Sequence, residues 1–226
     1  AGRWLAWRLV VIAVLGVGVV AVATWLVFFS AVLAVEGVRV EGNEVLSAAA
    51  VRRAADVPLG APLATADLDA VTARVARLRA VRTVDVSRSW PDRVRIAVRE
   101  RRAVAVVERD GTGRLRGVDA DGVAFRGYAA RPTGLPRIRV GRRAGQEAVA
   151  EAAAVAGALP ADVARRVAFI RVQTVDTISL RLRDGRTVRW GSAEDSADKS
   201  RVLAVLLGQQ AGYYDVSVPG RPVIRR

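Results

Sequence analysis

The sequence predicts an α+β fold with three parts: one N-terminal transmembrane helix, a module with the order strand-helix-helix-strand-strand, and a mostly antiparallel β module with helices. Three observations predict it: an uncharged apolar run near the N-terminus, two helical stripes flanked by alternating strands, and short strands separated by turn sequences. The expected boundaries are 1–8 for the end of a cytoplasmic segment, 9–33 for the transmembrane helix, 35–100 for the first module and 101–226 for the second.

The composition excludes several classes of chemistry. The chain has 226 residues, with no Cys, no His and no Met. Without Cys or His there is no disulfide framework, no thiolate nucleophile, no imidazole base and no ordinary zinc site. These absences exclude the Cys- and His-based catalytic and metal sites and leave carboxylate chemistry to be considered. Because no Met is present, we also expect a native segment to precede residue 1.

The positive charge is large but does not select a partner. Lys and Arg number 36 against 22 Asp and Glu, which gives a formal charge of +14. Lys199 is the only lysine, and the chain is rich in Ala and Val, which is typical of a high-GC genome. Such a charge permits binding to nucleic acid, anionic lipid or acidic polymers. Aromatic residues make up only 5%, too few for a base-stacking platform, so we expect no nucleic-acid partner.

The apolar run predicts a membrane span. Leu9 to Phe29 contains 21 residues without a charge, and at 1.5 Å per residue it forms a helix of roughly 31 Å. Aromatic residues flank it, as at membrane interfaces: Trp4 and Trp7 on one side, and Trp25, Phe28 and Phe29 on the other. The alternatives are a buried core helix and a signal peptide cleaved near Ala34. The run is longer than the roughly 7–15 residues of a signal h-region.

Basic residues set the expected orientation. Arg3 and Arg8 precede the run, and the first charge after it is Glu36. The positive-inside rule then places the N-terminus in the cytoplasm and the bulk of the chain outside. We expect a single-pass type II protein of the inner (plasma) membrane. Its outer part carries a net charge of +12, which is +14 less Arg3 and Arg8.

Local signals predict each element of the first module. Val38 and Val40 alternate with charged residues as in a strand, and Gly42-Asn43 predicts a turn. Ser47 is a candidate cap for a helix that runs to about Ala55. A second helix is expected near Asp67, because apolar residues recur at helical spacing at Leu68, Val71, Val75 and Leu78.

Two strands complete the module, joined by a turn at Ser89-Trp90-Pro91-Asp92. The first contains Val84 and Val86, and the second Val94, Ile96 and Val98. Two helices that each carry one apolar face must cover one face of a three-stranded sheet. We therefore expect the side chains of Val40, Trp90, Val94 and Ile96 to be largely buried.

These residues resemble the POTRA module of the FtsQ/DivIB family of bacterial cell-division proteins. The resemblance rests on the string VRVEGNEVLS from Val38 and the string VRTVDVSRSWPDRVRIAVRERRAVA from Val81. It includes Arg88 with Trp90-Pro91 before the last strand, and Glu100-Arg101 after it. Each piece alone is a common structural pattern, but in this order after a lone apolar run they are specific. The arginine bias adds that the source is a high-GC bacterium.

The second module is predicted as strands punctuated by turns and two helices. Strands are expected at 103–108, 115–118, 123–125, 167–172, 178–183 and 186–190, with turns at 109–111, 119–122 and Asp184-Gly185. Helices are expected at 144–159 and at 196–210, the latter with Val202, Leu203 and Leu206 inward. A last strand spans 214–218, and Val223 and Ile224 add a short continuation. TVRWGS from Thr187 and YYDVSV from Tyr213 are similar to the family's C-terminal pattern, although Ser217 and Val218 stand where an Arg-Tyr pair is common.

Acidic groups and arginine clusters give only weak functional signals. Asp119 and Asp121 resemble part of a calcium loop, but the other ligands of that motif are missing, which favours a β-turn. Two further acidic groups are Glu194, Asp195 and Asp198, and Asp67 and Asp69. Glu194 and Asp195 are placed at a helix start, which the helix dipole favours, and the paired carboxylates of a glycosidase are the alternative. The clusters Arg99, Arg101, Arg102 and Arg142-Arg143 are read as solvated surface, with lipid headgroups or an acidic partner as the alternative.

The resemblance implies a non-enzymatic scaffold of the divisome that sits in the membrane at the division septum. It implies no cofactor, no metal, no catalytic residue and no small-molecule substrate. It implies binding to FtsB and FtsL-type division proteins and to other divisome proteins, and coordination of septal peptidoglycan synthesis. Another single-span POTRA protein, in secretion or envelope assembly, is the alternative. An unpaired strand edge can accept a partner segment as an added strand, so the last strand is the candidate surface. The candidate partner-binding residues are Lys199, Tyr214, Asp215, Val216, Ser217 and Val218.

Overall fold

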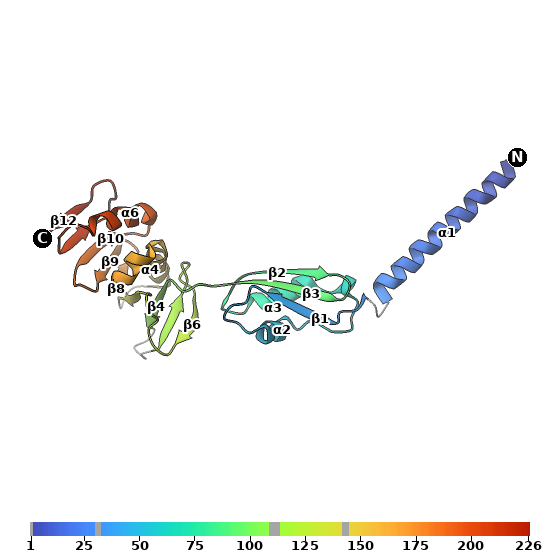
Figure 1. The fold of residues 1–226 in the computed structure, drawn as a ribbon, viewed down its shortest axis with the longest axis horizontal. Helices are drawn as coiled ribbons and strands as arrows, with labels where there is room; N and C mark the ends of the chain where they lie inside the picture. The colour runs from blue at the N-terminus through green and yellow to red at the C-terminus, as the bar shows by residue number, and fades with distance from the viewer. Residues whose placement is uncertain (1, 30–32, 109–113, 142–144) are drawn as a thin grey trace. The chain divides into compact units, whose positions relative to one another are not determined.

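A computed structural model describes residues 2–29, 33–108, 114–141 and 145–226 (Figure 1). The chain divides into two compact units, Ala1–Glu100 and Arg101–Arg226. The predicted turn at 109–111 and the pair Arg142-Arg143 lie outside the described residues. The architecture is mixed α+β, as the sequence predicts.

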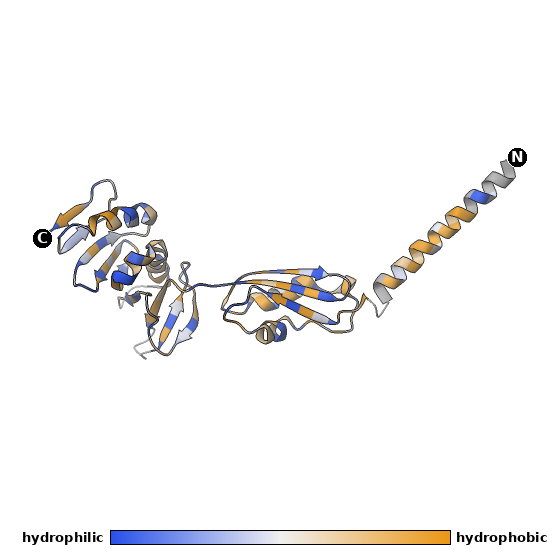
Figure 2. Cartoon of the chain, in the orientation of Figure 1, coloured by the Kyte–Doolittle hydropathy of each residue, from blue (hydrophilic) through white to orange (hydrophobic). Residues whose placement is uncertain are grey.

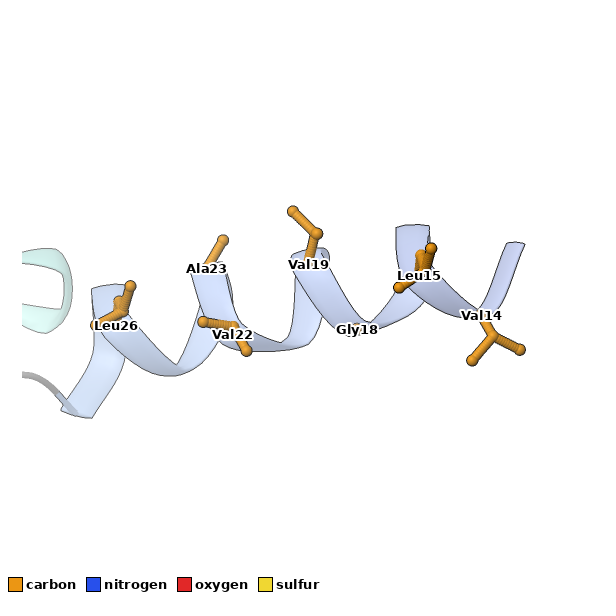
Figure 3. Close-up of a pocket in the computed structure, with 7 residues that line it drawn as sticks. All are labelled: Val14, Leu15, Gly18, Val19, Val22, Ala23 and Leu26. Atoms are coloured by element: carbon orange, nitrogen blue, oxygen red, sulfur yellow. The ribbon is translucent and has the colours of Figure 1, made fainter. Parts of the chain in front are cut away.

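The N-terminal helix α1 spans Gly2–Phe29, so it begins before the predicted residue 9 and ends before residue 33. Its described side chains, at residues 7, 8 and 11–26, are all exposed, and Figure 2 shows the apolar colouring along it. Gly18 leaves a shallow gap on one apolar face between Leu15 and Val22 (Figure 3). Among the described residues, no helix combines the length and apolarity that a membrane crossing requires.

The first unit contains the predicted order of strands and helices. It comprises β1 (Gly37–Glu41), α2 (Ala48–Ala55), a short 3-10 helix at Leu63–Thr65, α3 (Leu68–Ala76), β2 (Val81–Ser89) and β3 (Arg93–Glu100). Ser47 caps α2 as expected and accepts a hydrogen bond from Ala50 N; α3 begins near Asp67 as expected, and Asp67 accepts a hydrogen bond from Ala70 N. The local sequence therefore fixes where both helices begin.

The sheet of the first unit has the order β1-β3-β2, with β1 parallel and β2 antiparallel to β3. Val94, Ile96 and Val98 of the central strand are buried in one apolar cluster with residues of α2 and α3. Val40 is only half-buried, and the expectation that Trp90 is buried is wrong, because its side chain is 52% exposed. Trp90 lies in the turn between β2 and β3 and not on the sheet itself.

The second unit is built on a nine-stranded sheet with the order β12-β11-β10-β9-β8-β7-β4-β5-β6. Its strands are β4 (Ala105–Glu108), β5 (Leu115–Val118), β6 (Ala124–Tyr128), β7 (Arg137–Val140), β8 (Val167–Thr174), β9 (Thr177–Leu182), β10 (Thr187–Gly191), β11 (Tyr213–Asp215) and β12 (Val223–Arg225). Its helices are α4 (Gln146–Ala158), α5 (Ala161–Arg166) and α6 (Ser196–Leu206).

Five of the eight strand pairings in this sheet are antiparallel. The other three, β4 with β7, β7 with β8, and β10 with β11, are parallel. Two of these parallel pairs are joined by helical crossovers, β7 to β8 through α4 and α5, and β10 to β11 through α6, as parallel strands require. Helix α4 packs on β7 and β8, and against α6. The sequence did not predict β7 or α5 as elements.

Candidate functional site

The predicted last strand is not a sheet edge, and that expectation is wrong. Strand β11 pairs with β10 on one side, where Tyr214 lies beside Val188, and with β12 on the other, where Tyr214 lies beside Ile224. The strand also ends at Asp215. Val216 still donates its backbone N–H to Arg189 O at 3.0 Å, whereas Ser217 and Val218 lie outside the strand. The backbone groups of β11 are therefore not available to a partner.

The outer strand at this end of the sheet is β12, in red beside the C-terminus in Figure 1. Val223 is 47% and Ile224 40% exposed. The carbonyl oxygen of Arg225 accepts a hydrogen bond from Gly212 N at 2.9 Å, so the polar backbone groups of Arg225 face β11. Because these groups alternate along a strand, the N–H and C=O of Ile224 face outward. At the centre of β12 the open edge therefore offers one N–H and one C=O, both from Ile224.

Tyr214 stabilises this edge from within the core. Its side chain is fully buried, and its hydroxyl donates to Gln209 O at 2.8 Å and accepts from Arg186 Nη1 at 2.6 Å. Arg186 also pairs with Asp184 at 2.8 Å; this hydrogen bond raises the pKa of Arg186 and lowers the pKa of Asp184. Tyr214 is therefore a support of β11 and not a side chain that a partner can touch.

Asp215 closes the turn that follows β11. Its Oδ1 accepts hydrogen bonds from Ser217 N at 3.0 Å and from Ser217 Oγ at 2.6 Å, and its Oδ2 lies 3.5 Å from Arg189 Nη1. Burial by itself raises the pKa of Asp215, but the hydrogen bonds from Ser217 and the nearby Arg189 and Arg225 outweigh it, so the pKa is lowered. Val216 is buried, and Val218 is 57% exposed.

Lys199 is not a surface cation, which corrects the expectation that it reaches a partner. Its side chain is buried, and its Nζ donates to Ser192 O at 3.0 Å. Burial lowers the pKa of the ammonium group, and the charges of Asp195 and Glu194 oppose that shift. Lys199 therefore holds the loop that follows β10 against α6.

The inward face of α6 was assigned incorrectly from the sequence. The structure buries Leu203 as expected, but Val202 and Leu206 are only half-buried. Ser196, Lys199 and Ser200 are buried instead, at the helical spacing that leads to Leu203 and Leu207. Trp190 Nε1 donates to Ser196 Oγ at 3.0 Å, which gives this polar face its partners. The spacing was visible in the sequence, but polar residues do not mark a buried face by themselves.

The acidic residues singled out from the sequence lie in a turn and at a helix start. Asp119 is buried; its Oδ1 accepts from Asp121 N and Val123 N, and its Oδ2 pairs with Arg101. This pattern is a closed turn. No group of three or more acidic residues in the described part of the chain is placed to hold a metal ion. Glu194 and Asp195 lie at the start of α6, where Asp195 precedes its first turn.

Comparisons with known proteins find sequence matches in both units. A family model described as "POTRA domain, FtsQ-type" matches residues 33–101, and one described as "Cell division protein FtsQ/DivIB, C-terminal" matches residues 105–218. The chain is 42% identical to the cell division protein FtsQ of Streptomyces collinus over 97% of this chain and 90% of that protein. It is 37% identical to FtsQ of Mycolicibacterium smegmatis over 92% of this chain and 62% of that protein.

Among solved structures, the chain is similar to the major extracytoplasmic domain of the cell division protein DivIB from Geobacillus stearothermophilus. The sequence identity is 23% and the TM-score 0.37, over 45% of this chain and 87% of that chain. The curated relatives come from Streptomyces and mycobacteria, which are high-GC actinobacteria, as the arginine bias predicted. The matches of both family models and the identity over nearly the whole length lead to one conclusion: the chain belongs to the FtsQ/DivIB family of bacterial cell-division proteins.

Proposed function

We propose that this chain is a membrane-anchored scaffold of the divisome that captures FtsB by adding an extended segment of it to the outer edge of β12. The open edge of β12 is the observation that carries the proposal. Its strand residues are exposed, and the N–H and C=O of Ile224 point outward, so a partner strand can pair with them through its main chain. Such pairing does not require a fixed side-chain pattern in the partner. The family match to the C-terminal model argues against the secretion alternative.

Charge around β12 favours an acidic partner segment. Arg221, Arg225 and Arg226 are exposed at this end of the unit, and Asp215 on the neighbouring strand already accepts from Ser217 and lies by Arg189. An extended segment that carries Asp or Glu beside its strand residues gains in association rate and in orientation from this charge. The revised site replaces Lys199 and Tyr214, which are buried, with the strand Val223–Arg225.

The first unit offers a second open strand edge, at which another partner could bind. In the first unit β2 is an outer strand of the sheet β1-β3-β2, and Arg82, Thr83 and Asp85 on it are exposed. An FtsL-type protein or another divisome protein is a candidate for this edge. In this scheme the chain coordinates septal peptidoglycan synthesis by holding partners together, and its own residues carry out no chemical step.

We further propose that α1 anchors the chain in the plasma membrane with its N-terminus in the cytoplasm. The uncharged run Leu9–Phe29 and the basic flank of Arg3 and Arg8 support this. The start of the first unit fits such an anchor: Val35 N donates to Ala61 O and Glu36 N to Asp92 O, both at 2.8 Å. Two exposed apolar side chains, Leu59 and Trp90, lie close in sequence to these contacts, as expected for an interfacial position.

Partner capture is tested with the full chain in detergent, pulled down with FtsB. Ile224→Pro removes the outward N–H and leaves the groups that face β11, so we expect binding to weaken about tenfold or more. Ile224→Ala keeps the backbone donor and is the matched control, with an expected change of at most about threefold. Circular dichroism checks the fold of each variant. Wild-type binding by a folded Ile224→Pro chain would remove the β12 edge from the model.

The anchor is tested separately with a reporter active only outside the cytoplasm, fused after Arg226. We expect activity from that fusion and none from a cytoplasmic reporter at the same position. The opposite pattern would reverse the orientation, and with it the access of β12 to an extracytoplasmic FtsB segment. Recruitment to midcell, with filamentation on depletion, is the cellular result expected of a divisome scaffold.

A further inference from the structure

Three arginines of the second unit surround one hollow that contains no acidic residue. Its volume is about 380 Å³, and it lies where the loop before β7, the end of α5 and the residue after β9 meet. The residues that line it are Arg131, Pro132, Thr133, Gly134, Arg165 and Arg183. We call this hollow the arginine cradle. The size is within the range of small-molecule sites, about 300–1,000 Å³.

Two of the three guanidinium groups are held in place by single hydrogen bonds to the backbone. Arg183 Nε donates to Arg165 O at 2.8 Å, and Arg131 Nη1 donates to Ala168 O at 3.4 Å. Because a guanidinium has five N–H donors, each of these two keeps most of its donors for a ligand. Within the described part of the chain, the Arg165 side chain takes part in none of the hydrogen bonds or ion pairs. The cradle thus has oriented donors that are not used up.

The cradle differs from the arginine sites of this chain that contain ion pairs. In those sites an arginine lies beside a carboxylate: Arg95 beside Glu41, Arg101 beside Asp119, and Arg137 beside Glu108. The three charges of the cradle have no carboxylate among the residues that line it. The adjoining hollow, which shares Arg165 and Arg183, does contain two carboxylates, Asp162 and Asp184, and Asp184 is paired with Arg186 at 2.8 Å. What distinguishes the cradle is that three arginines line one hollow whose own lining contains no carboxylate.

An apolar hollow of about 400 Å³ adjoins the cradle and shares Thr133, Gly134 and Arg165 with it. Its other lining residues are almost all apolar: Val104, Leu135, Ala156, Gly157, Leu159, Ala161 and Ala164. A ligand that places an anion among the arginines can therefore extend an apolar portion across Gly134 into this second hollow. The two hollows together favour an amphiphile over a purely polar anion.

We propose that the arginine cradle binds the phosphate group of an anionic amphiphile such as a phospholipid. Planar guanidinium groups match phosphate oxygens through pairs of parallel N–H···O bonds, which a single ammonium cannot form. The shared chemistry is a phosphate oxyanion, and the apolar hollow selects a lipid phosphate over free phosphate. This site is independent of β12 and does not require that FtsB capture be correct.

The test is isothermal titration calorimetry on the full chain in a non-ionic detergent, with two probes. The probes are inorganic phosphate and dihexanoyl phosphatidic acid below its micelle concentration. We expect saturable binding of the lipid, about tenfold tighter than inorganic phosphate because of the apolar hollow. Equal affinities would overturn the assignment to an amphiphile, and absence of saturable binding by either probe would overturn the site.

Charge-neutralising variants separate the cradle from the general positive charge. Arg165→Gln removes a side chain without an internal partner, so it leaves the fold intact, and we expect it to weaken lipid binding about tenfold. Arg183→Gln should act in the same direction. Arg53→Gln, on the exposed face of α2 in the other unit, changes the net charge equally and should alter binding less than about twofold. An equal loss in Arg53→Gln and Arg165→Gln would show that only net charge attracts the lipid.

Discussion

The two units of this protein use their sheets differently. In the first unit a three-stranded sheet contains one parallel pair, and the helices bury apolar side chains such as Val71 and Val75. In the second unit a nine-stranded sheet contains three parallel pairs, and helix α6 buries Ser196, Lys199 and Ser200. A small apolar core needs little beyond its local pattern, whereas a large mixed sheet needs long crossovers and buried polar contacts to hold its outer strands. We therefore expect a core substitution in the first unit to act through lost apolar packing, and one in the second unit to act through lost polar contacts.

The largest effect is expected from a substitution that disrupts the core of the first unit alone. Ile96 is fully buried in β3, so Ile96→Asp places a carboxylate without a partner in an apolar core. We expect a loss of several kcal/mol. Hydrogen exchange should then quicken in β1, β2 and β3 while β8, β9 and β10 stay protected. The control is Thr83→Asp, an exposed position on β2, which should be nearly neutral. Unchanged exchange in β3 would mean that Ile96 faces solvent.

A smaller effect is expected from the support of β11 in the second unit. Tyr214→Phe removes a buried hydroxyl that both donates to Gln209 O and accepts from Arg186. We expect a cost of about 1 kcal/mol, because Gln209 O and Arg186 each lose a hydrogen bond while the ring stays packed. The fluorescence of the buried Trp190 follows unfolding of this unit in urea. Tyr213→Phe, on a half-buried neighbour, is the control. If both variants unfold alike, the hydroxyl of Tyr214 has no special role.

The smallest effect concerns pH and Lys199. Burial lowers its pKa in the folded chain below the unfolded value of 10.5, so the folded state binds this proton less tightly than the unfolded state. The cost of burying the charge is present at neutral pH and is relieved as the pH rises through the folded pKa toward the unfolded value. Stability should therefore rise over this window more in the wild type than in Lys199→Met, as measured by urea unfolding. Parallel pH profiles would contradict a strained ammonium.

Much of the first unit follows from the sequence because its signals are local. Ser47 and Asp67 cap the helices from within the same turn, and Val94, Ile96 and Val98 alternate along one strand. Such contacts lie a few residues apart, so the pattern contains all the information needed. The burial of Trp90 was predicted wrongly because the exposure of a turn residue depends on which other segments pack against the turn. No local pattern encodes that packing.

Sequence patterns were sufficient to identify the family, the order of elements in the first unit, and hairpins such as the one at Asp184-Gly185. The three-dimensional fold was needed to establish that β7 lies between β4 and β8, that Lys199 is buried, and that β12 rather than β11 is the outer strand. Edges are settled by pairings between distant segments, here Tyr214 with Ile224 and with Val188. These depend on crossover geometry and on packing across the whole sheet, so a strand that ends a sequence pattern need not end a sheet.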